Sequence, residues 1–240
     1  MMVPLELVVT VLLFAVVQSL FGIGLLVFGT PTLLLFGYSF EETLAFLLPS
    51  SILISLAQAL RGREHLGEMR RSIVLYCVPF IVGGLSLVLT GLAAFDVKML
   101  VGLALLLTAL TRLSDRSRQV LAGLLEKNTR PYLALMGLVH GLSNMGGGFL
   151  TILVTTLHDD KERVRANVSY AYFVFALSQI GVLVLLRPGV FTIQGLILAA
   201  LAFATYSTVG QLLYVKSSRP VYHHLITVFM LAYGLVLVVP

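Results

Sequence analysis

The stretch HGLSNMGGGFL, residues 140–150, interrupts an apolar run that extends from residue 131 to residue 157. About 20 apolar residues suffice for a helix to cross a bilayer, yet a histidine, a serine, an asparagine and three consecutive glycines stand at the centre of this run. Glycine is a poor helix former. The stretch therefore predicts a helix broken inside a membrane-embedded bundle, because unpaired backbone groups must be buried in protein or face a wet cavity.

The composition of the whole chain supports a membrane protein. Of its 240 residues, 58% are hydrophobic and 11% are charged, against roughly 25% charged in soluble domains. Apolar runs of helical length recur with charges between them, so the prediction is an all-α polytopic protein rather than a β-barrel. The first run lacks the basic start and cleavage site of a signal peptide. We expect about eight spans, at residues 5–28 (continuing to 37), 43–60, 72–90, 97–111, 131–157, 165–186, 191–213 and 221–239.

The order of these runs indicates an internal duplication. A shift of 122 residues places Gly24 on Gly146 and Gln18 on His140, and a shift of 121 places Gln58 on Gln179. The simplest account is two four-helix repeats, residues 1–111 and 131–240, joined by a cytoplasmic linker at 112–130, with the first and fifth helices broken. Four spans in each half make the repeats parallel. If each Gly-rich segment instead dips in and returns, the repeats are inverted, and the sequence leaves this open.

The basic residues of the loops give an orientation. With eight spans, ten Lys and Arg residues fall on one side of the membrane and six on the other, which predicts that both termini are cytoplasmic. The net charge of +5 comes from these short loops, so it reflects orientation and lipid head groups rather than nucleic-acid binding.

The broken helices are the candidate binding site. Amide groups at the start of a resumed helix carry partial positive charge and hold a small anion without a buried Lys or Arg. The three glycines at 146–148 do not share one helix face, as packing against a single neighbour would require, which favours close approach of a ligand to the backbone. The candidate substrate-binding residues are Ser143, Asn144, Gly146, Gly147, Gly148, Gly22, Gly24, Thr30, Pro31, Asn167, Ser169, Gln179, Gln58 and Ser50.

His140 is the most central ionisable residue of any predicted span. Ionisable groups inside membranes are functional candidates, and histidine titrates near neutrality, so His140 is a candidate proton relay. The alternative is a neutral histidine that hydrogen-bonds between helices.

Other chemistry is not indicated. The chain has one cysteine, Cys77, and neither His158 with the adjacent acids nor the His223–His224 pair forms a metal-ligand set. The sequence lacks P-loop, HExxH and GxSxG motifs. We therefore expect no enzyme activity, no metal and no cofactor, and the sequence leaves association into homo-oligomers open.

The duplicated segments GIGLLVFGTPTLL and SNMGGGFLTIL resemble the sulfite exporter TauE/SafE family of membrane anion transporters. The family pattern, Gly-x-Gly-Gly-Gly followed by Pro, is matched by Gly22, Gly24 and Pro31 in the first half and by the glycines at 146–148 in the second. Leu25 and Leu26 depart from it, as do Asn144 and Leu153.

This resemblance implies a secondary transporter that exports sulfite, an organosulfonate or a related anion across the bacterial cytoplasmic membrane. Its partners would be the small anion and the lipid bilayer, and a proton relay at His140 would add coupled protons. The alternatives are an anion channel of the same architecture and a non-transporting membrane scaffold.

Overall fold

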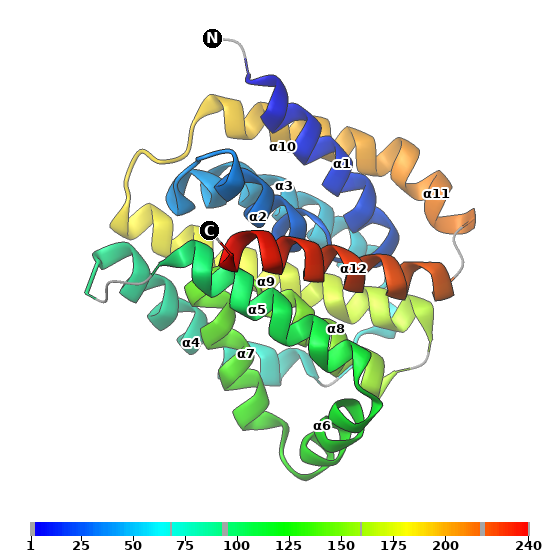
Figure 1. Cartoon of the computed structure of the whole chain (residues 1–240). Helices are drawn as coiled ribbons and strands as arrows, with labels where there is room; N and C mark the ends of the chain where they lie inside the picture. The colour runs from blue at the N-terminus through cyan, green and yellow to red at the C-terminus, as the bar shows by residue number, and fades with distance from the viewer. Residues whose placement is uncertain (1–2, 68, 93–95, 159, 217–218, 240) are drawn as a thin grey trace.

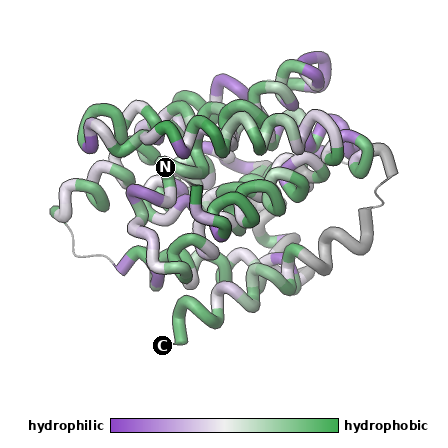
Figure 2. Tube along the Cα trace, turned by 90° about the horizontal axis from the view of Figure 1, so that it is seen from above, coloured by the Kyte–Doolittle hydropathy of each residue, from purple (hydrophilic) through white to green (hydrophobic). Residues whose placement is uncertain are grey.

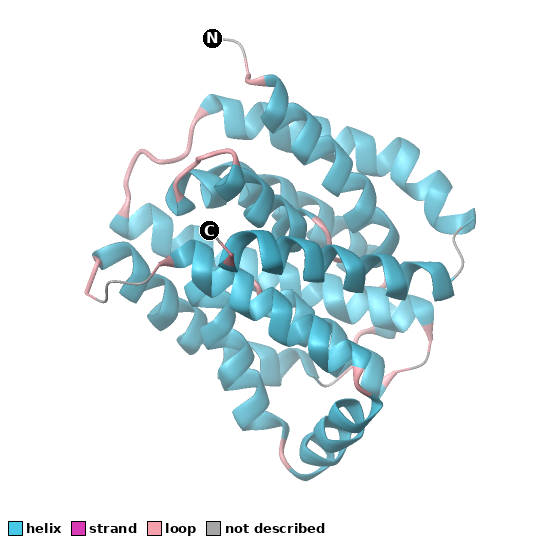
Figure 3. Ribbon diagram, viewed as in Figure 1, coloured by secondary structure: helices cyan, strands magenta, loops and turns pink. Residues whose placement is uncertain are grey.

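The computed structural model describes residues 3–67, 69–92, 96–158, 160–216 and 219–239. Within these ranges all regular structure is helical (Figure 3), which confirms the predicted class. The helices are α1 (Leu5–Phe21), α2 (Leu25–Leu35), α3 (Phe40–Arg61), η1 (Arg63–His65), α4 (Met69–Thr90), α5 (Val97–Leu113), α6 (Asp115–Lys127), α7 (Thr129–Ser143), α8 (Gly146–Leu157), α9 (Lys161–Leu186), α10 (Ile193–Thr205), the π-helical segment η2 (Tyr206–Gly210), α11 (Gln211–Lys216) and α12 (Arg219–Val238).

Four stretches in the described part of the chain are long and apolar enough to cross a membrane. They are α3, α4, α9 and the continuous run Ile193–Tyr214, which comprises α10, η2 and most of α11. Most residues of the helices are hydrophobic, and hydrophilic residues occur mainly near helix ends (Figure 2). Outward-facing apolar side chains such as Leu185 and Val228 suit contact with lipid better than contact with water.

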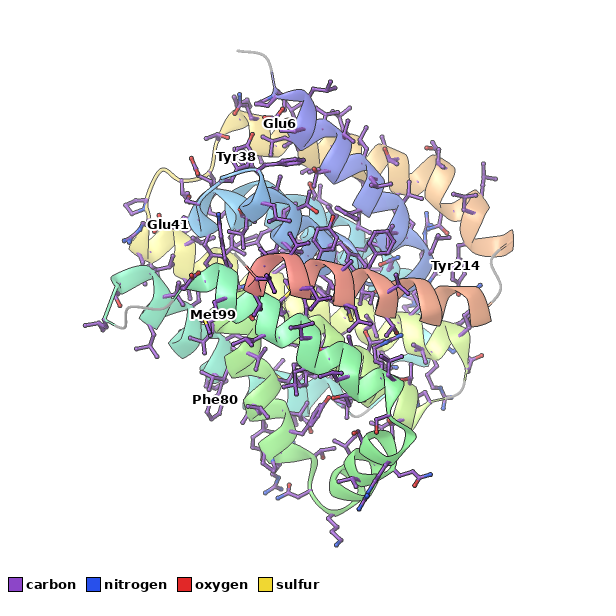
Figure 4. The ribbon with its side chains drawn as sticks, viewed as in Figure 1. Glu6, Tyr38, Glu41, Phe80, Met99 and Tyr214 are labelled. Atoms are coloured by element: carbon purple, nitrogen blue, oxygen red, sulfur yellow. The ribbon has the colours of Figure 1, made fainter. Side chains whose placement is uncertain are left out.

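The first Gly-rich segment turns the chain back on itself. α1 ends at Gly22, whose φ of 75° is left-handed, and α2 then runs antiparallel to α1. The rings of Phe14 and Phe28 lie 5.7 Å apart. At the open end of the hairpin, the hydroxyl of Tyr38 donates to the carboxylate of Glu6 at 2.9 Å, and both side chains are labelled there in Figure 4.

The second Gly-rich segment has the same geometry. Asn144 ends α7 with a φ of 63°, as Gly22 does 122 residues earlier in α1. α8 then returns along α7, so that the hydroxyl of Tyr132 donates to the Phe149 carbonyl at 2.7 Å. The interpretation of 5–28 and 131–157 as single spans was therefore wrong, because each is a helical hairpin whose ends lie on the same side of the bundle.

The remaining helices pair across the molecule. α3 and α9 run antiparallel, since the Gln58 side chain near the end of α3 pairs with Ser169 near the start of α9 at 2.9 Å. At the opposite ends of these helices, Glu41 pairs with Arg187 at 2.8 Å. α5 and α12 are also antiparallel and lie side by side (Figure 1). The hairpins pack against these pairs, which buries the tips of both hairpins in protein.

Candidate functional site

The start of α8 is enclosed on three sides by different elements. A β-carbon placed on Gly146 would lie 2.6 Å from the Cβ of His140 in α7. A β-carbon on Gly147 would overlap the hydroxyl of Tyr172 in α9, and one on Gly148 would overlap the side chain of Thr108 in α5. At each of the three positions a side chain would collide with a different neighbouring residue, so only glycine fits. Packing explains all three glycines, although they do not share a face, because the helix start is surrounded rather than laid against one partner.

Tyr172 brings a polar group to the backbone of the second break. Its side chain is 1% exposed and its hydroxyl lies against Gly147. Of the described residues, none forms a hydrogen bond with this hydroxyl. A buried hydroxyl without a partner costs free energy, and this one lies beside the first residues of α8.

Four more buried polar side chains, three from the two hairpins and one from α9, meet at the same break. His140 Nε2 lies 3.2 Å from the Oε1 atom of Gln179, and the side-chain amide of Asn144 donates to Thr30 Oγ1 at 2.8 Å. With the Gln179 amide in this orientation, Oε1 accepts from Nε2–H, and Nδ1 of a neutral His140 is then an acceptor. The Asn144–Thr30 bond joins the tip of the second hairpin to α2 of the first.

The unpartnered atoms at this break include both donors and acceptors. Within the described ranges, no hydrogen-bond partner is present for Tyr172 Oη, Gln179 Nε2, His140 Nδ1 or Asn144 Oδ1. Ser50 and Ser51 of α3, the helix antiparallel to α9, also carry unpartnered buried hydroxyls. Buried polar groups in proteins are nearly always hydrogen-bonded, so an accumulation of this kind fits a site that a polar ligand completes.

The first break, in contrast, is closed by its own side chains. Gln18 Oε1 accepts from the backbone amide of Leu25 at the start of α2, which is where an anion would bind. The Gln58 amide donates to the main-chain carbonyl of Gln18 at 2.9 Å and accepts from Ser169, while Gln18 donates to Ser55. These bonds give the Leu25 amide at the start of α2 and the Gln18 carbonyl near the end of α1 a partner within the protein.

The predicted residues thus divide into two clusters. Gln58 and Ser169 belong to the first break, and Gln179 belongs to the second. Ser169 and Gln179 are ten residues apart on α9, which corresponds to about 15 Å along the helix axis. The two breaks nevertheless adjoin each other, because a β-carbon on Gly22 would meet Ser169, and one on Gly147 would meet Tyr172, one turn further along α9, and Val27 of α2.

Several candidates form hydrogen bonds with the protein backbone. Ser143 donates to the Val139 carbonyl and accepts from the Met145 amide, so it shapes the turn. Asn167 bonds the backbone of His65 and Gly67 in the α3–α4 connection.

In the first hairpin, Gly22 forms the left-handed turn. A β-carbon on Gly24 would lie 2.5 Å from the Gln18 backbone nitrogen. Pro31 is buried within α2.

Tyr172 was missed by the sequence reasoning. Tyr172 precedes Gln179 by seven residues, which places both on one face of α9, and this spacing was the available signal. Among the described residues, no group of three His, Cys, Asp or Glu side chains could hold a metal ion.

Comparison with known proteins gives one match. The family model for the sulfite exporter TauE/SafE matches residues 7–237. No curated protein and no solved structure matches the chain. Because the family match covers nearly the whole sequence, the chain belongs to the sulfite exporter TauE/SafE family.

Proposed function

We propose that this protein is a secondary transporter that exports a small oxyanion, sulfite or a short organosulfonate, and that the anion binds at the start of α8. The family implies a membrane exporter of this kind. The observation that carries the proposal is the buried Tyr172 hydroxyl, which lies without a protein partner against Gly147. Backbone amides at a helix start and neutral donors around them suit a single small anion.

The surrounding residues have distinct roles in this proposal. The hydroxyl of Tyr172 and the free amide of Gln179 donate to the anion oxygens. Ser50 contributes a donor from α3. The first break, closed by Gln18 and Gln58, acts as a rigid counterpart that holds α2 against the site through Thr30.

Proton coupling through His140 is part of the proposal. When Nε2–H donates to Gln179, Nδ1 carries a lone pair, which would repel an approaching anion. Addition of a proton to Nδ1, or binding of the singly protonated anion, converts this contact into a hydrogen bond. Anion and proton would then leave together, and because the proton gradient of a bacterial cytoplasmic membrane points inward, the outward gradient of the anion would supply the driving force in a chain without an ATP-binding motif.

The hairpins also suggest how the chain lies in the membrane. If both hairpins enter and return, each half crosses the bilayer three times, by α3, α4 and α5 and then by α9, α10–α11 and α12. An odd number of crossings makes the two halves inverted repeats, related by an axis in the membrane plane. The predicted division into residues 1–111 and 131–240 is retained, with α6 as the connection.

With six crossings, the Lys and Arg residues are divided more unequally between the two sides of the membrane than with eight spans. Figure 4 labels Glu6, Glu41 and Met99 near one end of the bundle and Tyr214 at the other. Of the chain's 16 Lys and Arg residues, 14 fall at the Tyr214 end and only Lys98 and Arg187 at the opposite end. The positive-inside rule then makes the Tyr214 end cytoplasmic. We propose that both termini are periplasmic, which replaces the orientation expected from eight spans.

A reporter fusion tests the orientation. We expect alkaline phosphatase fused after residue 240 to be active and green fluorescent protein at the same place to be dark, because the C-terminus faces the periplasm. A fluorescent fusion together with an inactive phosphatase fusion would contradict the inverted arrangement.

A binding screen tests the substrate class. Purified protein is heated in detergent with sulfite, a short organosulfonate, sulfate or phosphate, and the unfolding temperature is recorded. A specific ligand at a hundredfold its Kd adds about 2.7 kcal/mol of stability. We expect stabilisation by sulfite or the organosulfonate, and no effect of any of these anions would argue against the proposed site.

A further inference from the structure

A second cavity lies apart from the α8 start, among α5, α6, α7 and α8. Its volume is about 700 Å³, within the range of about 300–1,000 Å³ that is typical of ligand sites. Most of its wall is apolar. The residues lining it are Leu107, Thr111, Arg116, Ser117, Val120, Lys127, Asn128, Pro131, Tyr132, Leu135 and Phe149.

The charges on the lining residues have one sign. Arg116 and Lys127 both lie on α6, and no acidic residue is among the described lining residues. Arg116 is the second residue of α6 and Lys127 is the last, so about 16 Å of helix axis separates them. Ser117 and Asn128, next to these cations in the sequence, add neutral hydrogen-bonding groups at the same rim.

The apolar part of the cavity is open rather than sealed in the core. Leu107 of α5 and Leu135 of α7 are 55% and 52% exposed. In a bilayer such side chains face lipid. α6 leaves the bundle at the end of α5, as Figure 1 shows, and this is the end where the basic residues gather. The cavity thus combines an apolar wall with a cationic rim at the level of the head groups.

We propose that this cavity binds an anionic phospholipid of the cytoplasmic leaflet. Its acyl chains lie along Leu107, Leu135 and Phe149, and its phosphate lies between Arg116 and Lys127. Basic pockets between membrane helices on the cytoplasmic side are suited to such head groups. A small anion such as sulfite has no chain to occupy the apolar wall. The proposal rests on the membrane orientation given above and is independent of the transported substrate.

The position of the cavity connects the lipid to the transport site. Phe149 lines the cavity and directly follows Gly148 in α8. The Tyr132 hydroxyl donates a hydrogen bond to the Phe149 carbonyl at 2.7 Å, and Tyr132 also lines the cavity. A bound lipid would therefore support the second hairpin from its cytoplasmic side.

The absence of tryptophan from the chain permits a direct test. A Leu135→Trp variant carries the chain's single tryptophan on the cavity wall, where it can be excited apart from the tyrosines. It is reconstituted in phosphatidylcholine vesicles that contain either brominated phosphatidylglycerol or brominated phosphatidylcholine, both of which quench tryptophan on contact. Each basic residue near the membrane surface favours an anionic lipid by a factor of about five. We expect phosphatidylglycerol to quench with an apparent association at least fivefold stronger than phosphatidylcholine.

Two variants provide the controls. Replacement of both cations in the double variant Arg116→Gln/Lys127→Gln should reduce the preference to about one. Leu201→Trp, on an exposed face of α10 away from the cavity, should be quenched equally by the two lipids. If Leu135→Trp does not fold, Val120→Trp on α6 places the probe on the opposite wall.

Three results would overturn the proposal. The first is equal quenching of Leu135→Trp by both lipids, and the second is a preference that survives loss of Arg116 and Lys127. The third is release of the quenching by sulfite alone, which would assign the cavity to the substrate path. Sulfite flux in the same vesicles is measured separately, so a failure of the lipid site is distinguished from a failure of the transport proposal.

Discussion

Replacement of Tyr172 by Phe separates a ligand contact from a packing contact. The change keeps the ring, which packs beside His140 and Phe175 with centroids 6.2 and 6.1 Å away, and removes only the hydroxyl. Within the described structure this hydroxyl has no hydrogen-bond partner. Its loss should therefore leave the free energy of unfolding unchanged or slightly higher, because an unsatisfied buried polar group disappears.

The effect on binding should be large. A hydrogen bond to a charged ligand contributes about 1.5–3 kcal/mol, so we expect the Kd for sulfite to rise by roughly ten- to hundredfold. Thermal unfolding in detergent measures stability, and titration of the purified protein with sulfite measures Kd.

Tyr206 supplies the matched control. It is equally buried, but its hydroxyl accepts from Arg61 at 3.3 Å, far along the chain from the second break. Tyr206→Phe should lower the free energy of unfolding by about 1 kcal/mol and leave Kd unchanged. An unchanged Kd in Tyr172→Phe, or a loss of stability equal to that of Tyr206→Phe, would refute a ligand-binding role for Tyr172.

The other predictions concern the first break and proton coupling. Gln58→Leu removes the hydrogen bonds to the carbonyls of Gln18 and Ser19 and to the hydroxyl of Ser169, so the free energy of unfolding should fall by roughly 2–5 kcal/mol while the Kd for sulfite stays the same; wild-type stability would show that the network does not hold the hairpin. Coupling through His140 predicts that His140→Gln flattens the pH dependence of flux between about pH 5.5 and 7.5, measured in liposomes at a fixed sulfite gradient. A pH profile identical to that of the wild type would leave His140 as a hydrogen-bonding group between helices.

The sequence predicted the class and the breaks but not the path of the chain. Apolar runs and clustered charges sufficed for an all-helical membrane protein, and the glycines marked where helices end. A left-handed residue such as Gly22 or Asn144 ends a helix, but it does not determine whether the next helix continues forward or turns back. That direction is set by contacts with distant residues, such as the bond from Asn144 to Thr30, 114 positions away.

The candidate site was recognised only in part for a related reason. His140, Gln179 and the glycines at 146–148 stand out as polar or small residues in an apolar run. Tyr172 does not, because a tyrosine in such a run is typical of a packed core, and only the fold brings its hydroxyl to Gly147. The sequence also could not show that the side chains of Gln58 and Ser169 are hydrogen-bonded within the first break, because these bonds join three helices, α1, α3 and α9.

The most direct test of the transport site is counterflow of radiolabelled sulfite in proteoliposomes loaded with unlabelled sulfite. The wild type should show saturable uptake that overshoots equilibrium. Gly147→Leu should show none, because its side chain would displace Tyr172 and fill the start of α8, whereas Leu25→Gly in the closed first break should retain counterflow. Linear uptake without overshoot would indicate a channel, absence of uptake in the wild type would indicate a scaffold, and wild-type counterflow in Gly147→Leu would place the anion elsewhere.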